Sequence, residues 1–377
     1  MARRTISSRS DVENLIYGCA FMGTGGGGNP RLGVEVLTEA LERGLRIELV
    51  DAEDVPDEAW TCCAFGMGSI APKTAETVAE MRRWGLVKKI AEGTARMLPY
   101  AVRELESYLG IEFDAVVPIE LGGASTAGAV LAAATHEVPV IDGDYVGRAI
   151  PEIAQTTPCI KGKKITPLIC HDEWGNICII KETVNYALAE RIGKLISVAG
   201  YGTGMAGFPM KGNEMKETVI RGTLSEAMEL GRRVREARER GKDPVREAVE
   251  FKGGWLLFKG VVSGKNWESR EGYMYGTTLI KGMEEFRGEE AKIWFKNENH
   301  ILWIDGEPKV TSPDLIEVVD LETAEPITNT DLKAGDRVAV IGVKCVEIFR
   351  TEKGLEVLGP KHFGFDIEYI PIEERMR

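Results

Sequence analysis

Hydrophobic positions in the first part of the chain alternate repeatedly between helical and extended spacing. In some segments apolar residues recur every three to four positions, and in others they form short continuous runs. These are the patterns of an amphipathic helix and of a buried strand, respectively. The segments predicted to be helical are 11–22, 31–44, 74–82, 99–110 and 124–135. Those predicted to be strands are 45–50, 61–67, 116–119 and 138–141. This alternation predicts an α/β domain with a mostly parallel or mixed sheet.

The pattern changes after Pro167. Two predicted strands, 168–170 and 177–181, flank an Asp-Glu-Trp-Gly-Asn turn, and helices are expected near 185–195 and 224–240. From Gly254 onward, almost every segment has strand spacing bounded by turn residues. We therefore expect an α/β N-terminal domain over 1–167 and a C-terminal α+β domain over 168–377, ending in a mainly β subdomain at about 250–377.

The segment from residue 118 to 152 carries the strongest signal for chemistry. Its two short apolar strands end at Glu120 and Asp142. If these strands are parallel neighbours, both acids lie at the same edge of the sheet, where open α/β sheets bind ligands. Gly122 and Gly123 begin the intervening helix, whose free N–H groups would favour an anionic or carbonyl-bearing ligand.

Several carboxylates surround one arginine in this segment. Asp142 and Asp144 are two positions apart, so an extended backbone places their side chains on the same side. Two neighbouring carboxylates share a proton, hold a cation, or are neutralised by a base such as Arg148. Glu152 follows in a segment that its glycine and proline make a shaped loop. The alternative interpretation is that the acids are turn formers and helix caps, and that the arginine is a structural ion-pair partner.

Four consecutive glycines, 25 to 28, precede Asn29. Such a run favours a loop whose N–H groups hold a ligand, although it has neither the Gly-Lys-Ser/Thr ending nor the preceding strand of a nucleotide-binding loop. The alternative is a tight turn between helices. A second glycine-rich tract, 200–207, either faces the first across the domain boundary or permits close helix packing. Ser125 is an activated serine or, more simply, a helix cap.

Two of the four histidines have neighbours that suggest a base or a metal ligand. His171 lies beside Asp172 and Glu173, and His362 lies in a Gly-Pro-Lys-His-Phe-Gly segment. The predicted ligands of a divalent metal are Asp144, His171 and Asp172, although no metal-binding spacing supports them. The seven cysteines are scattered, so we expect reduced thiols that act mainly as core residues.

Composition excludes some classes of function. A net charge of −12 over 377 residues disfavours nucleic acid, because a non-specific binder needs a basic face. No apolar run approaches the ~18 residues of a membrane span, and the first residues lack an apolar signal core. We therefore expect a cytoplasmic protein that has no nucleic-acid or membrane partner. We also expect no nucleotide cofactor, and a homo-oligomer is plausible.

Six strings in order along the chain resemble the S-methyl thiohydantoin desulfurase family. They are GTGGGGNP, PIELGGAS, VIDGDYVGRAIPE, the Asp172–Asn176 turn, SPDLIEVVDLETAEPIT and VLGPKHFGFDIEYIPIE, and they extend from residue 23 to 373. The resemblance implies a hydrolase that acts on a five-membered cyclic ureide or thioureide. It also implies a divalent metal, zinc or manganese, and a genomic association with hydantoinases and oxoprolinases. Where the family often has Asp after the glycine run, this chain has Asn29.

The resulting hypothesis is attack by water on the ring carbon that bears sulfur or oxygen. Asp142 or Asp144 would act as general base or hold the metal, the glycine loop would stabilise the developing anion, and Arg148 would bind a substrate carboxylate. The predicted catalytic residues are Glu120, Asp142, Asp144, Arg148 and Glu152. The predicted substrate-binding residues are Gly25, Gly26, Gly27, Gly28, Asn29, Gly122, Gly123, Ser125 and Thr157. The alternatives are a non-catalytic ligand-binding or partner subunit of a hydantoinase-type system, and a hydrolase for an unrelated cyclic amide.

Overall fold

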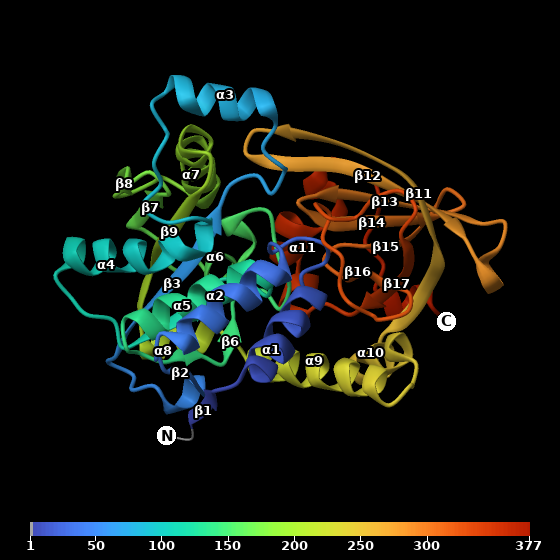
Figure 1. The fold of residues 1–377 in the computed structure, drawn as a ribbon, viewed down its shortest axis with the longest axis horizontal. Helices are drawn as coiled ribbons and strands as arrows, with labels where there is room; N and C mark the ends of the chain where they lie inside the picture. Colours follow the sequence, from blue (N-terminus) through green and yellow to red (C-terminus); the bar gives the residue numbers. More distant parts are fainter. Residues whose placement is uncertain (1–2) are drawn as a thin grey trace.

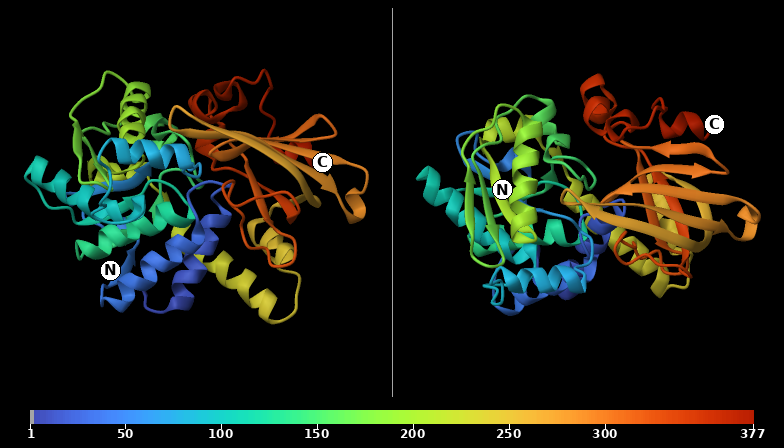
Figure 2. Two further views of the ribbon diagram at one scale, coloured as in Figure 1. Left: turned by 45° about the horizontal axis from the view of Figure 1, so that its top comes forward. Right: turned by 90° about the horizontal axis from the view of Figure 1, so that it is seen from above.

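The computed structural model describes residues 3–377 and shows two lobes side by side (Figures 1 and 2). One lobe contains an eight-stranded sheet with helices, and the other contains a seven-stranded sheet. The expectation of an α/β domain followed by a β-rich subdomain is therefore confirmed.

The eight-stranded sheet is mixed. Its order is β1-β2-β5-β4-β3-β9-β7-β8, in which β2, β5, β4 and β3 are parallel and the remaining neighbours are antiparallel. The strands are β1 (Arg3–Ile6), β2 (Ile47–Val50), β3 (Trp60–Met67), β4 (Ala115–Pro118), β5 (Val140–Ile141), β7 (Leu168–Asp172), β8 (Ile177–Ile180) and β9 (Thr203–Lys211). The predicted parallel pairing of the strands that precede Glu120 and Asp142 is confirmed, because β4 and β5 are parallel neighbours.

Most of the predicted helices form close to their expected bounds. The helices of this lobe are α1 (Arg9–Phe21), α2 (Pro30–Glu42), α3 (Ala75–Arg83), α4 (Leu98–Leu109), α5 (Gly123–Thr135), α6 (Thr157–Ile160), α7 (Tyr186–Gly200), α8 (Gly212–Thr218), α9 (Thr223–Glu239) and α10 (Pro244–Lys252). Local signals set several of their starts. The Asn29 side chain caps α2, with proline at its first position, and Ser8 and Asp11 form a capping box at α1.

The glycine-rich tract 200–207 begins as a turn after α7 and continues as β9, between β3 and β7. Its glycines leave room for neighbours on one face, because a Cβ at Gly204 would lie 2.6 Å from the Met97 Cβ. The next residue, Met205, points to the opposite face, towards α7. Helices α4 and α7 therefore cover opposite faces of the sheet.

The second lobe is an antiparallel sheet in the order β15-β14-β13-β12-β11-β17-β16. It curls into a half-barrel, because β16 also packs against β14 and β15. Its core includes Phe258, Ile293 and Val340. The strands are β11 (Trp255–Arg270), β12 (Tyr273–Gly282), β13 (Glu290–Lys296), β14 (Glu298–Ile304), β15 (Glu307–Thr311), β16 (Leu315–Asp320) and β17 (Arg337–Val343). After it come α11 (Glu352–Leu358), a 3-10 turn η6 (Pro360–Phe363) and α12 (Ile372–Arg375).

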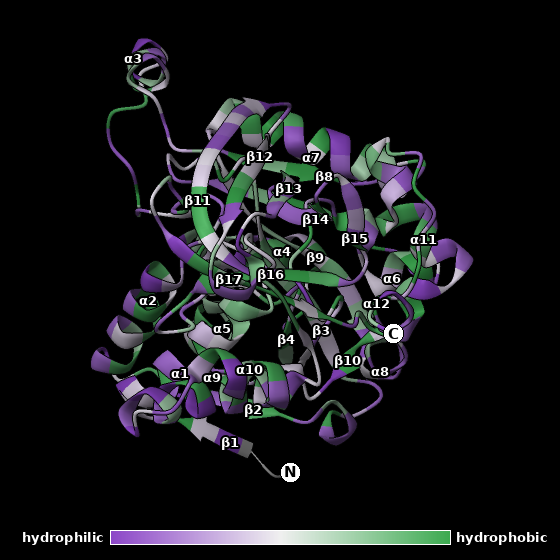
Figure 3. Cartoon of the chain, turned by 90° about the vertical axis from the view of Figure 1, so that its right-hand side faces the viewer, coloured by the Kyte–Doolittle hydropathy of each residue, from purple (hydrophilic) through white to green (hydrophobic). Residues whose placement is uncertain are grey.

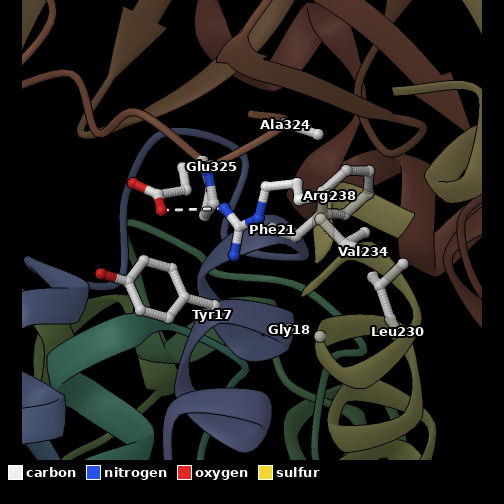
Figure 4. Close-up of a pocket in the computed structure, with 10 residues that line it drawn as sticks. Tyr17, Gly18, Phe21, Leu230, Val234, Arg238, Ala324 and Glu325 are labelled. Carbon is white, nitrogen blue, oxygen red and sulfur yellow. Dashed lines mark hydrogen bonds and ion pairs between the residues drawn. The ribbon is translucent and has the colours of Figure 1, made fainter. Parts of the chain in front are cut away.

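Several contacts join the lobes. Helices α9 and α1 of the first lobe pack along each other, and both meet the 321–326 loop of the second lobe. There the Arg238 side chain points to Glu325, and its Nη1 is 2.8 Å from the Glu325 Oε1 (Figure 4). The crevice there has a volume of about 10 Å³, roughly enough for one water molecule. At the far side, the β11–β12 hairpin reaches over the first lobe, and the hydroxyls of Ser269 and Ser69 are 3.0 Å apart. Helix α3 stands away from the rest of the molecule (Figure 3).

The division at residue 167 stays a prediction, since the sheet of the first lobe continues through β9. No helix within residues 3–377 is long and apolar enough to span a membrane.

Candidate active site between the lobes

A cavity of about 450 Å³ lies where the two lobes meet. The first lobe contributes the glycine loop, the end of β4 with Glu120, and the 150–153 segment. The second lobe contributes Asn297, Glu298, Thr328 and Thr330. A cavity of this size, lined by apolar side chains together with polar groups that converge on it, is typical of a small-molecule site.

The glycine run forms one wall of this cavity, and close packing explains its composition. A Cβ at Gly26 would lie 1.9 Å from the Glu298 carboxylate, and a Cβ at Gly27 would lie 2.5 Å from the Gly122 Cα. Gly27 and Gly28 also have positive φ angles of 66° and 81°, which only glycine adopts readily. The loop is fixed to the second lobe, because the Asn329 N–H donates to the Gly25 carbonyl at 2.7 Å.

The start of α5 is already occupied by this loop. The N–H groups of Ala124 and Ser125 both donate to the Gly27 carbonyl at 3.0 Å, so a protein oxygen stands where we expected an anionic ligand. The N–H groups of Gly27 and Gly28 themselves have no acceptor among the described residues. The loop, rather than the helix end, therefore has donors available to a ligand.

Two carboxyl groups, Glu120 from the first lobe and Glu298 from the second, are buried in the cavity wall. Glu120 Oε2 accepts a hydrogen bond from the Ile150 N–H at 2.8 Å, whereas Glu298 Oε2 has no partner within residues 3–377. Burial raises the pKa of both groups. The charge of Glu120 raises the pKa of Glu298 further, and Arg148 and Lys194 lower it. The pair therefore keeps a proton at a pH where exposed glutamates have lost theirs.

Lys194 of α7 is the basic group of this cavity. Its side chain is only 8% exposed, and its nearest carboxylate oxygen, Glu190 Oε1, is 3.8 Å away. The ammonium group lies 4.1 Å from the centre of the Tyr273 ring and donates no hydrogen bond to the described part of the chain. Burial lowers the pKa of Lys194, and the charges of Glu190 and Glu298 oppose this shift. The group can donate hydrogen bonds to a bound molecule.

Glu152 lies at the mouth of the cavity and connects the lobes. Its carboxylate pairs with Lys296 at the end of β13 and lies 3.2 Å from His362 Nε2 in η6. Burial would raise the pKa of Glu152, but His362 and Lys296 outweigh it and lower the pKa to about 2. Glu152 is therefore an ionised partner of two bases.

Asp142 and Asp144 do not line the cavity. The Asp142 carboxylate accepts hydrogen bonds from the N–H and hydroxyl of Ser225. The Asp144 carboxylate accepts from the N–H groups of Val146 and Gly147 and from the Thr223 hydroxyl, at 2.7–2.8 Å. Both aspartates thus hold the start of α9, as in the alternative interpretation that they are turn formers and caps.

Arg148 is fully buried between the lobes, 1% exposed, and all five of its N–H groups have protein acceptors. The acceptors are the Thr24 hydroxyl and the carbonyl oxygens of Ala149, Asn299, Pro313 and Asp314, at 2.9–3.3 Å. This arrangement leaves it no donor for a substrate carboxylate.

The remaining predicted residues are dispersed. Thr157 donates to the Thr218 carbonyl at 2.6 Å, and Gly123 packs against Pro30. The Asp172 carboxylate accepts hydrogen bonds from Trp174 and Asn176, and His171 Nδ1 lies 3.1 Å from the Asp172 carbonyl oxygen.

A metal centre of the predicted composition does not form. Within residues 3–377, no three His, Cys, Asp or Glu side chains are grouped so that they could hold a metal ion. Asp144, His171 and Asp172 therefore do not fit the divalent metal that the resemblance implies.

The cavity contains Glu120, Ser125, Glu152, Asn29 and the glycine loop among the residues predicted from the sequence. Glu298 and Lys194 were not predicted. A weak signal existed for each: Glu298 begins a polar Glu-Asn-His run inside a strand-rich region, and Lys194 follows Glu190 by four positions on one face of a helix.

Fold and site together define a two-lobed α/β and β protein with a small-molecule cavity at the interface between the lobes. The chain belongs to the S-Me-THD-like family: the N-terminal domain of that family matches residues 10–182, and the C-terminal domain matches residues 184–372. A protein from Chromobacterium violaceum, solved by X-ray crystallography, has the same fold, with a TM-score of 0.77 at 20% identity over 99% of this chain and 100% of that one. A comparison with curated proteins gave no match.

Proposed function

We propose that this protein is a hydrolase that removes sulfur from a thiohydantoin-like five-membered ring bound between the lobes. The observation that carries the proposal is the buried pair of Glu120 and Glu298 beside Lys194 in the inter-lobe cavity. A carboxyl pair with raised pKa values holds one proton near neutral pH, so that one group acts as a base while the other acts as an acid.

The reaction would proceed by attack of water on the ring carbon that bears sulfur. The ionised carboxyl of the pair accepts the proton of water as the new C–O bond forms. The protonated carboxyl gives its proton to sulfur as the C–S bond breaks, so the sulfur leaves as a thiol and the ring retains a carbonyl group. Atoms balance without a further reactant: ring–SR and water give a ring carbonyl and HSR.

Two other groups would assist this step. Negative charge develops on the ring during the attack. The N–H groups of Gly27 and Gly28 have no acceptor among the described residues, and the Lys194 ammonium has a carboxylate oxygen of Glu190 3.8 Å away but donates no hydrogen bond to that part of the chain. Donors held in place before the reaction stabilise such charge strongly in a cavity that excludes water. Glu152, paired with two bases, would keep the mouth of the cavity in shape.

The experiment is turnover of hydantoin, 2-thiohydantoin and its S-methyl derivative, followed by thiol release and by ring absorbance. We expect Glu120→Gln and Glu298→Gln each to lower kcat/KM by about 10² or more. Asp142→Asn is the matched control, because that carboxylate holds α9 outside the cavity. Turnover at the wild-type rate in both glutamine variants would refute the proposed roles.

The second candidate, a non-catalytic binding subunit, predicts a different result. The rings would raise the melting temperature of the purified chain further as their concentration increases, yet none would be turned over.

A further inference from the structure

A second, wider chamber of about 860 Å³ opens beside the cavity of the proposed active site. The two share Lys194, Lys73, Glu152 and the turn at Tyr201 and Gly202, so the chambers adjoin at the Lys194 side chain. A hydantoin-sized ring needs no more space than the inner chamber of about 450 Å³ provides. The outer chamber is therefore space that the proposed reaction does not use.

Large apolar side chains are exposed on two walls of the outer chamber. On one side, α7 exposes Leu195 at 62% and Val198 at 49%. On the other side, the β11–β12 hairpin contributes Trp267, 40% exposed, together with the rings of Tyr273 and Tyr275. Large apolar side chains that remain exposed around one hollow mark a binding surface.

The charges around this chamber favour a neutral occupant. Four carboxylate and four basic side chains line it, so they carry no net charge. Several are already paired: Lys296 binds Glu152 and lies 4.0 Å from the Tyr273 ring centre, and Glu190 accepts the Tyr273 hydroxyl at 2.6 Å. An aromatic or branched aliphatic group would leave these pairs intact and would pack on the exposed side chains of Trp267, Leu195 and Val198.

We propose that the outer chamber binds a large, uncharged apolar substituent on the ring held in the inner chamber. The substrates would then be thiohydantoin-like rings that carry an aromatic or bulky aliphatic group on the ring carbon directed towards Lys194. This inference rests on the proposed function for the identity of the ring, and it adds the class of substituent.

The test is calorimetric binding of two rings, 5-methyl- and 5-benzyl-2-thiohydantoin, to the full-length chain. We expect the benzyl ring to bind at least about tenfold more tightly, because the outer chamber removes its phenyl group from water. Leu195→Trp places a larger side chain in the chamber from an exposed position, and it should reduce the ratio of the two affinities to about threefold or less. The matched control is Ile179→Trp on β8, where an isoleucine with 45% exposure lies outside both chambers and the ratio should stay unchanged.

The outcomes separate this inference from the proposed function. Equal affinity for the two rings, or an unchanged ratio in Leu195→Trp, would overturn the substituent subsite while leaving the hydrolase intact. A preference for the benzyl ring that Leu195→Trp abolishes would support the subsite even if no ring were hydrolysed. Binding of neither ring would overturn both.

Discussion

Replacing Arg148 by methionine tests whether this arginine has a structural role or binds substrate. Methionine is unbranched, has no charge and reaches as far as the arginine Nε position, so the variant removes the guanidinium group and keeps the packing of the apolar stem. The loss leaves buried carbonyl groups of Asn299, Pro313 and Asp314 without the donors that they have in the native protein. It also removes the positive charge that lowers the pKa values of Glu298 and Glu317.

The magnitude follows from these contacts. Each buried acceptor left without a donor costs about 1–3 kcal/mol, so three of them give roughly 3–9 kcal/mol. The upper end is too large, because the native protein already carries the cost of burying the guanidinium. Removal of one member of a buried charged network typically costs about 3–5 kcal/mol. We expect the free energy of unfolding to fall by about 3–5 kcal/mol in Arg148→Met.

The assay is urea-induced unfolding followed by tryptophan fluorescence and circular dichroism, with Arg148→Lys as the comparison. Lysine keeps the charge but not the planar set of five donors, so it should recover less than half of the loss. A free energy of unfolding within about 1 kcal/mol of the wild type in Arg148→Met would refute the structural role. If that stable variant also lost affinity for a ring bearing a carboxylate, Arg148 would be a substrate-binding residue.

Three further predictions concern other parts of the site. Gly27→Ala should lower the free energy of unfolding by about 2 kcal/mol or more, because this position combines a positive φ with a close backbone contact. Gly44 has a similar φ and no described neighbour within 4 Å of an added Cβ, so Gly44→Ala should cost only about 1 kcal/mol. Equal losses in thermal unfolding would argue against the close packing at Gly27. Because its two basic partners lower the pKa of Glu152 to about 2, its contribution to stability is complete above the ordinary glutamate range and is lost as the pH falls towards 2. The difference in free energy of unfolding between wild type and Glu152→Gln should thus shrink by on the order of 2–3 kcal/mol from pH 6 to pH 2.5, and a constant difference would contradict it. Finally, the raised pKa values of Glu120 and Glu298 predict a bell-shaped dependence of kcat/KM on pH, with its acid limb above about pH 5, and a flat profile from about pH 5 to 9 would count against the pair.

Helices and strands could be predicted from the sequence where the hydrophobic pattern of a single segment is enough to define the element. The strands before Glu120 and Asp142 are short apolar runs bounded by turns, and each lies close along the chain to the helix that connects them. The strand role of β9 could not be predicted in this way. Its glycines read as loop residues, and they suit a strand only because Met97 and Leu168 approach them from distant segments.

The site was predictable in one lobe only. Glu120 and the glycine loop stand out because special residues cluster in a short stretch of sequence. Glu298 and Lys194 join them only through the packing of the lobes, for which one sequence gives no pairing information. Asp142 and Asp144 show the opposite difficulty, because the same spacing suits a catalytic pair and a pair of caps, and their partners on α9 follow about 80 residues later.

The central position of β9 has a consequence for how this chain can be made. Thr61 and Met210, which pair across β3 and β9, are 149 positions apart, so the middle of the sheet closes late during synthesis. Until β9 arrives, β3 has an unpaired edge and the β7–β8 hairpin has no connection to the sheet. The N-terminal family domain, residues 10–182, ends before β9 begins. A polypeptide that ended at that boundary would expose both strand edges to other chains and aggregate. We therefore expect the two family domains to form one folding unit, in which the inter-lobe cavity forms only when synthesis is nearly complete.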